Sequence, residues 1–268
     1  MLNYDLSSRL ACSSLLYRAF TLDRALDAIA PTGIGYVDLW AVPGFVEHVR
    51  AGKDTPASVA AKLKDRGLRA SSISAYGLTG AAMVARLDFA GAIGARAVIT
   101  TAPARDYDRH EATDDVRALG RAAQSAGVVL CLANHINTWM DTAEAIAGFL
   151  DDVGHPRVQL SFGPTHAYIT PVTHEALAAA AGNRIGHAYL WSLASGAKTR
   201  DEYGDGDAQT PSPTNGVDFR SMLRVLEQRN YNGFYTFMWH GTEHWPLKRI
   251  AASLAGARAH VVAMAKAG

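Results

Sequence analysis

The fold is indicated most clearly by residues 128–162, VVLCLANHINTWMDTAEAIAGFLDDVGHPRVQLSF. Two short apolar runs, 128–134 and 158–162, flank a segment that begins with the helix-capping residue Thr142. The apolar residues spaced along one face of that segment are Ile146, Phe149 and Leu150. Strand, capped helix and strand are the parts of one βαβ unit, so this stretch predicts two neighbouring parallel strands joined by a helix.

The same alternation runs from one end of the chain to the other. Apolar runs of strand length lie at 11–15, 35–40, 70–76, 97–101, 128–134, 158–162, 185–191 and 234–239. Helical patterns separate them, and eight such units are the number that closes a barrel. A chain of 268 residues with 49% hydrophobic residues can bury that core. We therefore predict an α/β fold, a single (β/α)8 TIM barrel, with residues 1–268 forming one domain.

Composition excludes several classes of partner. The 26 Lys and Arg residues nearly balance the 25 Asp and Glu residues, and no basic run stands out, which argues against nucleic acid and anionic membranes. The opening residues lack the basic and apolar regions of a signal peptide, and no apolar run is long enough to span a bilayer. We expect a cytoplasmic protein in which Cys12 and Cys131, both in predicted strands, are reduced core thiols.

One of the segments that follow the predicted strands is much longer than an ordinary βα turn. Residues 194–216, ASGAKTRDEYGDGDAQTPSPTNG, are polar, rich in Gly, Pro and Asp, and have no periodicity. They follow the seventh predicted strand, so in a barrel they would lie at the carboxyl-terminal mouth. The segment is either a lid over a ligand or a solvated insertion without a role in binding.

Several segments together resemble the xylose isomerase-like barrels, a family that includes sugar isomerases, epimerases and dehydratases. The resemblance rests on residues 13–40, 67–76, 133–135 (ANH), 155–168 (HPRVQLSFGPTHAY), 184–192 (RIGHAYLWS) and 217–237. Their order and spacing agree across nearly the whole chain. The resemblance implies the barrel fold, whereas function does not follow from fold alone.

The family's metal site has no counterpart at the matching positions. Members typically hold one divalent cation with a Glu, an Asp, a His and a second Glu at the ends of strands five to eight. By resemblance, these positions correspond to Ala133, Gly163, Tyr189 and Met238. Because Mg²⁺ and Mn²⁺ prefer oxygen ligands and the two glutamates also serve as bases, the resemblance implies that the metal and the usual proton shuttle are both lost. No cofactor is therefore expected.

Other polar side chains remain at the predicted mouth. Since side chains alternate along a strand, we predict His135, His166 and His240 as acid and base residues, because imidazoles titrate near neutral pH. Tyr189 is predicted to donate its hydroxyl to a developing oxyanion. The residues predicted to contact substrate are Tyr76, Asn134, Trp139, His187, Trp191 and Trp239. His187 lies a layer lower, which favours a hydrogen-bonded core histidine, and the tryptophans could equally close the top of the barrel. The three imidazoles could instead form a relocated zinc site.

Three functions remain open at this point. The first is a metal-independent relative of the sugar isomerases and epimerases that isomerises, eliminates or cyclises a small polyhydroxylated or keto ring compound. The second is a non-catalytic barrel that binds a ligand or supports a partner. The third is an ordinary metal-dependent isomerase or epimerase, and a homodimer is possible in each case because barrels of this family often pair.

Overall fold

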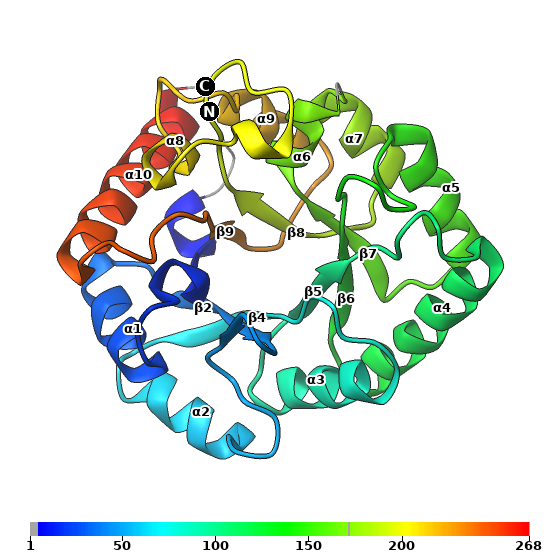
Figure 1. Ribbon diagram of the computed structural model, residues 1–268, viewed down its shortest axis with the longest axis horizontal. Helices are drawn as coiled ribbons and strands as arrows, with labels where there is room; N and C mark the ends of the chain where they lie inside the picture. The colour runs from blue at the N-terminus through cyan, green and yellow to red at the C-terminus, as the bar shows by residue number, and fades with distance from the viewer. Residues whose placement is uncertain (1–4, 171, 268) are drawn as a thin grey trace.

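The computed structural model describes residues 5–170 and 172–267, and within them eight parallel strands close into a barrel (Figure 1). The strands, in order around the barrel, are β1 (Leu10–Ser13), β2 (Tyr36–Val42), β4 (Arg69–Ser74), β5 (Ala97–Thr101), β6 (Val129–Ala133), β7 (Val158–Phe162), β8 (Ile185–Leu190) and β9 (Tyr235–Phe237). Strand β1 pairs in parallel with both β2 and β9, which completes the circle. The predicted (β/α)8 barrel is therefore confirmed.

An outer ring of helices covers the barrel (Figure 1). Its members are α1 (Leu22–Ile29), α2 (Pro56–Lys64), α3 (Gly80–Ala92), α4 (Arg109–Ser125), α5 (Ala143–Val153), α7 (His174–Ala181), α9 (Phe219–Gln228) and α10 (Leu247–Ala267). The Thr142 hydroxyl accepts a hydrogen bond from the backbone N–H of Ala145 at 3.1 Å, so α5 begins at the predicted cap. None of the helices in the described ranges is both long and apolar enough to cross a membrane.

Short elements decorate the mouth and the ends of the barrel. They are β3 (Val46–Glu47), which pairs antiparallel with β2, the helices α6 (Pro164–Ile169) and α8 (Gly206–Gln209), and the 3₁₀ turns η1 (Leu6–Arg9), η2 (Ser14–Tyr17), η3 (Ala30–Thr32) and η4 (Arg200–Glu202). Residues 14 and 15 belong to η2 rather than to the predicted first strand, because the Ser13 hydroxyl accepts the Leu15 N–H and turns the chain.

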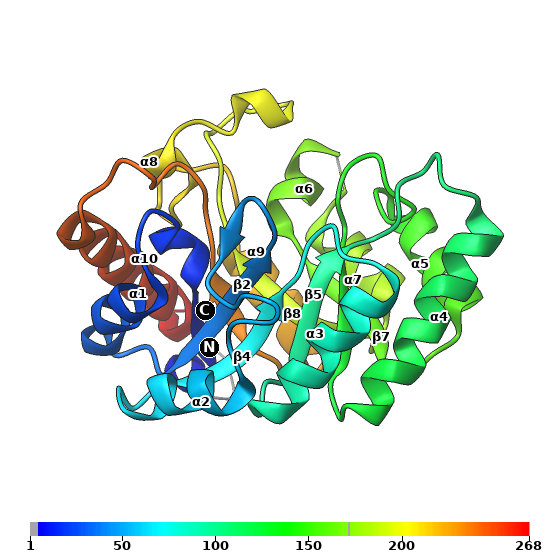
Figure 2. The same ribbon diagram turned by 60° about the horizontal axis from the view of Figure 1, so that its bottom comes forward.

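The interior is filled by side chains from the strands, with no room for larger ones at some positions. A β-carbon added at Gly186 on β8 would lie 2.6 Å from the Cys131 sulfur on β6. Cys12 and Cys131 are buried free thiols, as expected. Figure 2 shows the segment after β8 standing above one end of the barrel.

Candidate active site

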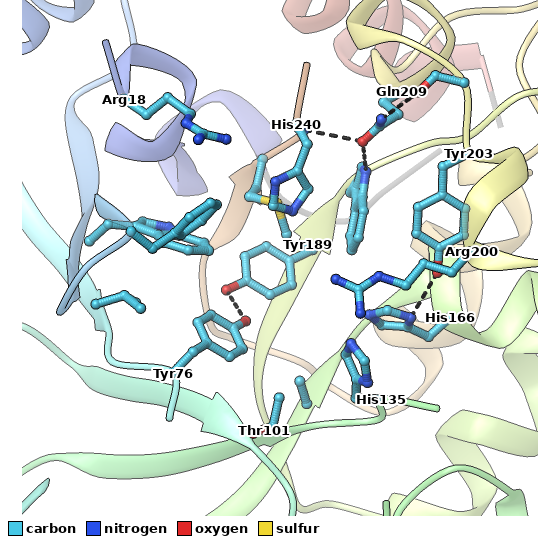
Figure 3. Close-up of a pocket in the computed structure, with 18 of the residues that line it drawn as sticks. Arg18, Tyr76, Thr101, His135, His166, Tyr189, Arg200, Tyr203, Gln209 and His240 are labelled. Carbon is cyan, nitrogen blue, oxygen red and sulfur yellow. Dashed lines mark hydrogen bonds between the residues drawn. The ribbon is translucent and has the colours of Figure 1, made fainter. Parts of the chain in front are cut away.

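A cavity of about 620 Å³ opens at the carboxyl ends of the strands (Figure 3). Ala133, Gly163, Tyr189 and Met238, at or just past the ends of β6 to β9, line its floor. Loops after the strands supply the walls, as in other barrels of this architecture. Aromatic rings line it as well, notably Trp40, Tyr76 and Trp191.

Three histidines predicted from the sequence meet in this cavity. His135 follows β6, His166 lies in α6 and His240 follows β9, and all three line it. The ring centroids of His135 and His166 are 4.3 Å apart. The ring of Trp191 contacts the rings of both His166 and His240, with centroid distances of 5.3 Å and 5.4 Å.

The hydrogen bonds of the three imidazoles differ. Nδ1 of His135 lies 2.9 Å from the carbonyl oxygen of Ile136, so it carries the proton and leaves Nε2 as an acceptor. Nδ1 of His166 pairs with the hydroxyl of Tyr203 at 3.1 Å. Within the described ranges, the ring of His240 has no hydrogen-bond partner. Both ring nitrogens of His240, which lines the cavity, are therefore without a protein partner among the described residues.

Burial keeps all three imidazoles neutral at neutral pH. It lowers the pKa of His135 and, more strongly, the pKa of His166, and it lowers the pKa of His240 to about 4. The positive charge of Arg200 lowers all three pKa values further, and Arg18 adds to the effect on His240. A neutral imidazole can accept a proton at one nitrogen and donate one from the other.

Two arginines line the cavity that the sequence interpretation did not identify. Arg18, just past η2, lies 3.9 Å from a carboxylate oxygen of Glu243, with its guanidinium over the ring of Phe45. Arg200, in η4, has no ion-pair partner among the described residues, and its guanidinium points into the cavity beside His166 (Figure 3). Nothing local in the sequence distinguishes these arginines from surface ones.

The segment 194–216 forms one wall of the cavity. Its residues at the cavity are Arg200, Asp201, Tyr203, Gly204 and Gln209. The side-chain oxygen of Gln209 accepts hydrogen bonds from the indole N–H of Trp191 at 3.0 Å and the backbone N–H of His240 at 3.1 Å. This glutamine, also missed by the sequence interpretation, ties the segment to the ends of β8 and β9.

Four of the six predicted substrate contacts are not among the residues that line the cavity, whereas Tyr76 and Trp191 are. The side-chain oxygen of Asn134 accepts a hydrogen bond from the backbone N–H of Gly163 at 2.7 Å, and its side-chain nitrogen donates one to the carbonyl oxygen of Gly163 at 3.0 Å. His187 lies deeper, bonded to the hydroxyls of Ser161 and Thr236.

The remaining two are tryptophans. Trp139 donates its indole N–H to the carbonyl of Tyr107 and lies against the guanidinium groups of Arg105 and Arg109. Trp239 is fully buried and does not line the cavity, whereas the preceding residue Met238, just past the end of β9, does.

The positions that resemble the family's ligand set do not fit a divalent metal. Ala133 and Met238 offer no charged or imidazole ligand, and the Tyr189 hydroxyl is hydrogen-bonded to Ser74 and Tyr76. A β-carbon at Gly163 would lie 3.0 Å from the side-chain oxygen of Asn134. Across the described residues, no three His, Cys, Asp or Glu side chains gather in a way that could hold a metal ion, the three cavity histidines included.

The family model of the xylose isomerase-like TIM barrels matches residues 26–260, so the chain belongs to this family. A comparison with curated protein sequences gave no match.

Solved structures with the same fold include enzymes of more than one reaction class. An L-ribulose 3-epimerase superposes with a TM-score of 0.75 at 18% identity, covering 97% of this chain and 95% of its own. A probable 3-DHS dehydratase from Bacillus anthracis gives 0.71 at 16% identity, covering 92% and 97%. A D-allulose 3-epimerase from Methylomonas sp., in complex with D-allulose, gives 0.63 at 21% identity, covering 86% and 84%. At these identities the likeness shows a shared fold.

Proposed function

We propose that this protein is an enzyme that moves protons on a small polyhydroxylated or keto ring compound without the divalent metal of its family. One observation carries the proposal. The strand ends that resemble the family's ligand set bear Ala133, Gly163, Tyr189 and Met238, while three neutral imidazoles and an unpaired guanidinium converge on the same cavity. The cavity has therefore kept acid and base groups while its floor offers no metal ligands.

The chemistry follows from the free nitrogens. Nε2 of His135 or a ring nitrogen of His240 accepts a proton from the carbon next to a carbonyl group, leaving an enolate. Where the deprotonated carbon carries a hydroxyl group, the hydroxyl proton moves to the enolate oxygen and the abstracted proton is returned to the former carbonyl carbon, which shifts the carbonyl group and gives isomerisation. Where the β-carbon carries a hydroxyl group, the enolate expels it as water, with a proton supplied by an imidazole, which gives elimination. Both reactions begin with removal of the same proton.

An enolate needs a positive partner for its oxygen, and we assign that role to Arg200. It lines the cavity with its guanidinium beside His166 (Figure 3), and its positive charge adds, after burial, to the lowering of the pKa values of all three histidines. A preorganised cation in a partly enclosed cavity stabilises developing negative charge. Tyr189, predicted from the sequence for this role, is already hydrogen-bonded to Ser74 and Tyr76.

Hydrogen–deuterium exchange tests the proposal. The protein is incubated in D₂O with D-fructose, D-allulose, L-ribulose or 3-hydroxycyclohexanone, with EDTA or with added Mn²⁺, and the products are followed by NMR. We expect deuterium at carbon or loss of water for at least one compound, equally fast under both conditions and abolished by His135→Asn or by His240→Asn, whichever residue is the base. Activity that appears only with Mn²⁺ would restore the metal-dependent alternative.

A non-catalytic, ligand-binding barrel is the second candidate, and one observation favours it. Burial makes the three imidazoles weak bases, with the pKa of His240 lowered to about 4. The cavity would still bind a ring compound between its aromatic walls. Absence of reaction with every compound under both conditions, together with saturable binding of one of them, would support this candidate over catalysis.

A further inference from the structure

A buried carboxylate beneath the cavity floor has no part in the proposed chemistry. Asp38, on β2, is completely buried. Its oxygens accept hydrogen bonds from three serine hydroxyls, Ser13 at 3.0 Å, Ser72 at 2.9 Å and Ser74 at 2.9 Å, and from the indole N–H of Trp40 at 3.0 Å. Among the described residues no cation pairs with it. Burying a charge costs free energy, and here only the hydrogen bonds from neutral donors offset that cost.

A chain of hydroxyl groups connects this carboxylate with the cavity. The Ser74 oxygen lies 3.2 Å from the Tyr189 hydroxyl, which lies 2.8 Å from the Tyr76 hydroxyl. Figure 3 shows the two tyrosine hydroxyls pointing at each other, and both residues line the cavity. The chain therefore runs from Asp38 through Ser74 and Tyr189 to Tyr76.

Counting hydrogen atoms gives the chain a direction. A carboxylate only accepts, so the one hydroxyl hydrogen of Ser74 is directed at Asp38. Tyr189 must then donate its single hydrogen to Ser74, and Tyr76 must donate its own to Tyr189. Tyr76, which is half-buried, is left with an oxygen that can only accept.

We infer that Asp38 makes the Tyr76 oxygen a hydrogen-bond acceptor site, which selects ligands that present a hydroxyl or N–H group to this wall. Asp38 is thus a specificity-determining residue that acts through Ser74 and Tyr189. Arg200 offers only donors to the cavity, so a ligand bound to both must place an acceptor at Arg200 and a donor at Tyr76. The inference rests on the proposed function only in taking the cavity as the ligand site.

Neutron diffraction on crystals exchanged in D₂O tests the direction of the chain. The expected nuclear density places a deuterium of Tyr76 toward Tyr189, one of Tyr189 toward Ser74 and none on Asp38. A deuterium on the Asp38 carboxyl group, or a Tyr76 deuterium pointing into the cavity, would overturn the inference. Because this measurement needs neither a variant nor turnover, its result is independent of whether the proposed metal-free catalysis is correct.

A matched pair of probes tests the selectivity. Binding of 4-fluorophenol, a donor, and 4-fluoroanisole, its methyl ether, is measured by fluorine NMR. The wild type should prefer the phenol by about tenfold, the effect of one hydrogen bond. Asp38→Asn should remove or reverse this preference, because its amide can donate to Ser74 and free the serine hydrogen for Tyr189.

Two further variants complete the design. Tyr76→Phe removes the acceptor itself and should also abolish the preference, which keeps the test decisive if Asp38→Asn does not fold. Ser72→Ala removes a donor to Asp38 that lies outside the chain and should leave the preference intact. Equal affinity of the wild type for the two probes, or an unchanged preference in Tyr76→Phe, would contradict the inference.

Discussion

His187 and His240 lie in the same barrel but differ in the hydrogen bonds of their ring nitrogens. Both ring nitrogens of His187 are bonded, to the hydroxyls of Ser161 and Thr236, in the fully packed interior. The ring of His240 lines the cavity and has no hydrogen-bond partner in the described part of the chain. The same type of side chain is therefore part of the packed interior at one position and lines the cavity without a protein partner at the other.

Substituting each histidine by asparagine should separate these roles. His187→Asn should lower the free energy of unfolding by about 1–3 kcal/mol, since at least one buried hydroxyl loses its partner. His240→Asn should change it by less than about 1 kcal/mol, because no protein hydrogen bond is lost. Urea denaturation of both variants measures the difference, and a larger loss for His240→Asn would show that its role is structural.

The effect of the Arg200 charge should be measurable in the pKa values of His166 and His240. Arg200→Gln removes a positive charge near His166 and His240, so the pKa of each imidazole should rise. Nitrogen-15 NMR of labelled histidines follows the two pKa values. Lys198→Gln, in the same segment, serves as the control and should leave them in place; unchanged values in Arg200→Gln would place its charge away from the histidines.

At the scale of elements, the segment 194–216 behaves as part of the barrel wall. Besides the bonds of Gln209, the backbone N–H of Ser192 donates to Gln209 and that of Ala194 to Tyr203. The side-chain nitrogen of Gln209 also donates to the carbonyl of Gly204 at 2.8 Å. These bonds hold Arg200 and Tyr203 over the cavity, and we propose that the segment is the fixed wall of the ligand site.

Removing the Gln209 amide should loosen this wall. Gln209→Ala leaves the buried indole N–H of Trp191 and the N–H of His240 without their acceptor, so unfolding should become easier by about 1–3 kcal/mol. Thermal denaturation and limited proteolysis within residues 194–216 measure the effect. The exposed Gln228, at the end of α9, provides the control Gln228→Ala, and equal behaviour of the two variants would contradict a structural role for Gln209.

At the scale of the whole molecule, buried neutral histidines tie stability to pH. Burial lowers the pKa of His187 to about 3 from its ordinary 6.5, and it also lowers the pKa values of His48, His166 and His240. Between the folded and unfolded pKa values the unfolded chain binds more protons. The stabilisation is therefore complete above the unfolded value of 6.5 and is lost as pH falls toward the folded value.

The free energy of unfolding should accordingly fall as the pH is lowered below 6.5. One pKa unit corresponds to about 1.4 kcal/mol, so the fall should amount to several kcal/mol. Urea denaturation over a pH series measures it, and His187→Asn should flatten the curve. A wild-type curve that is flat below this pH would contradict the prediction.

The sequence by itself determined the barrel and the location of its histidines. Alternating strand and helix patterns depend on neighbouring residues, and burial of one face of each element enforces them, as in the unit around Thr142 and Phe149. The position of a residue at a strand end also sufficed to bring His135, His166 and His240 to one cavity, because parallel strands of a barrel all end at the same mouth.

Only the tertiary structure decided which groups meet across that mouth. Arg18 and Arg200 come from loops far apart in the chain. Ser74 on β4 contacts both Asp38 on β2 and Tyr189 on β8 only because the three strands face one interior. The folded chain also engages Asn134 in a hydrogen bond with Gly163 and His187 in one with Ser161, so neither side chain is directed at the cavity as predicted. Local patterns carry no information on such pairings, because they depend on the closure of the barrel, which fixes the distances between side chains remote in sequence.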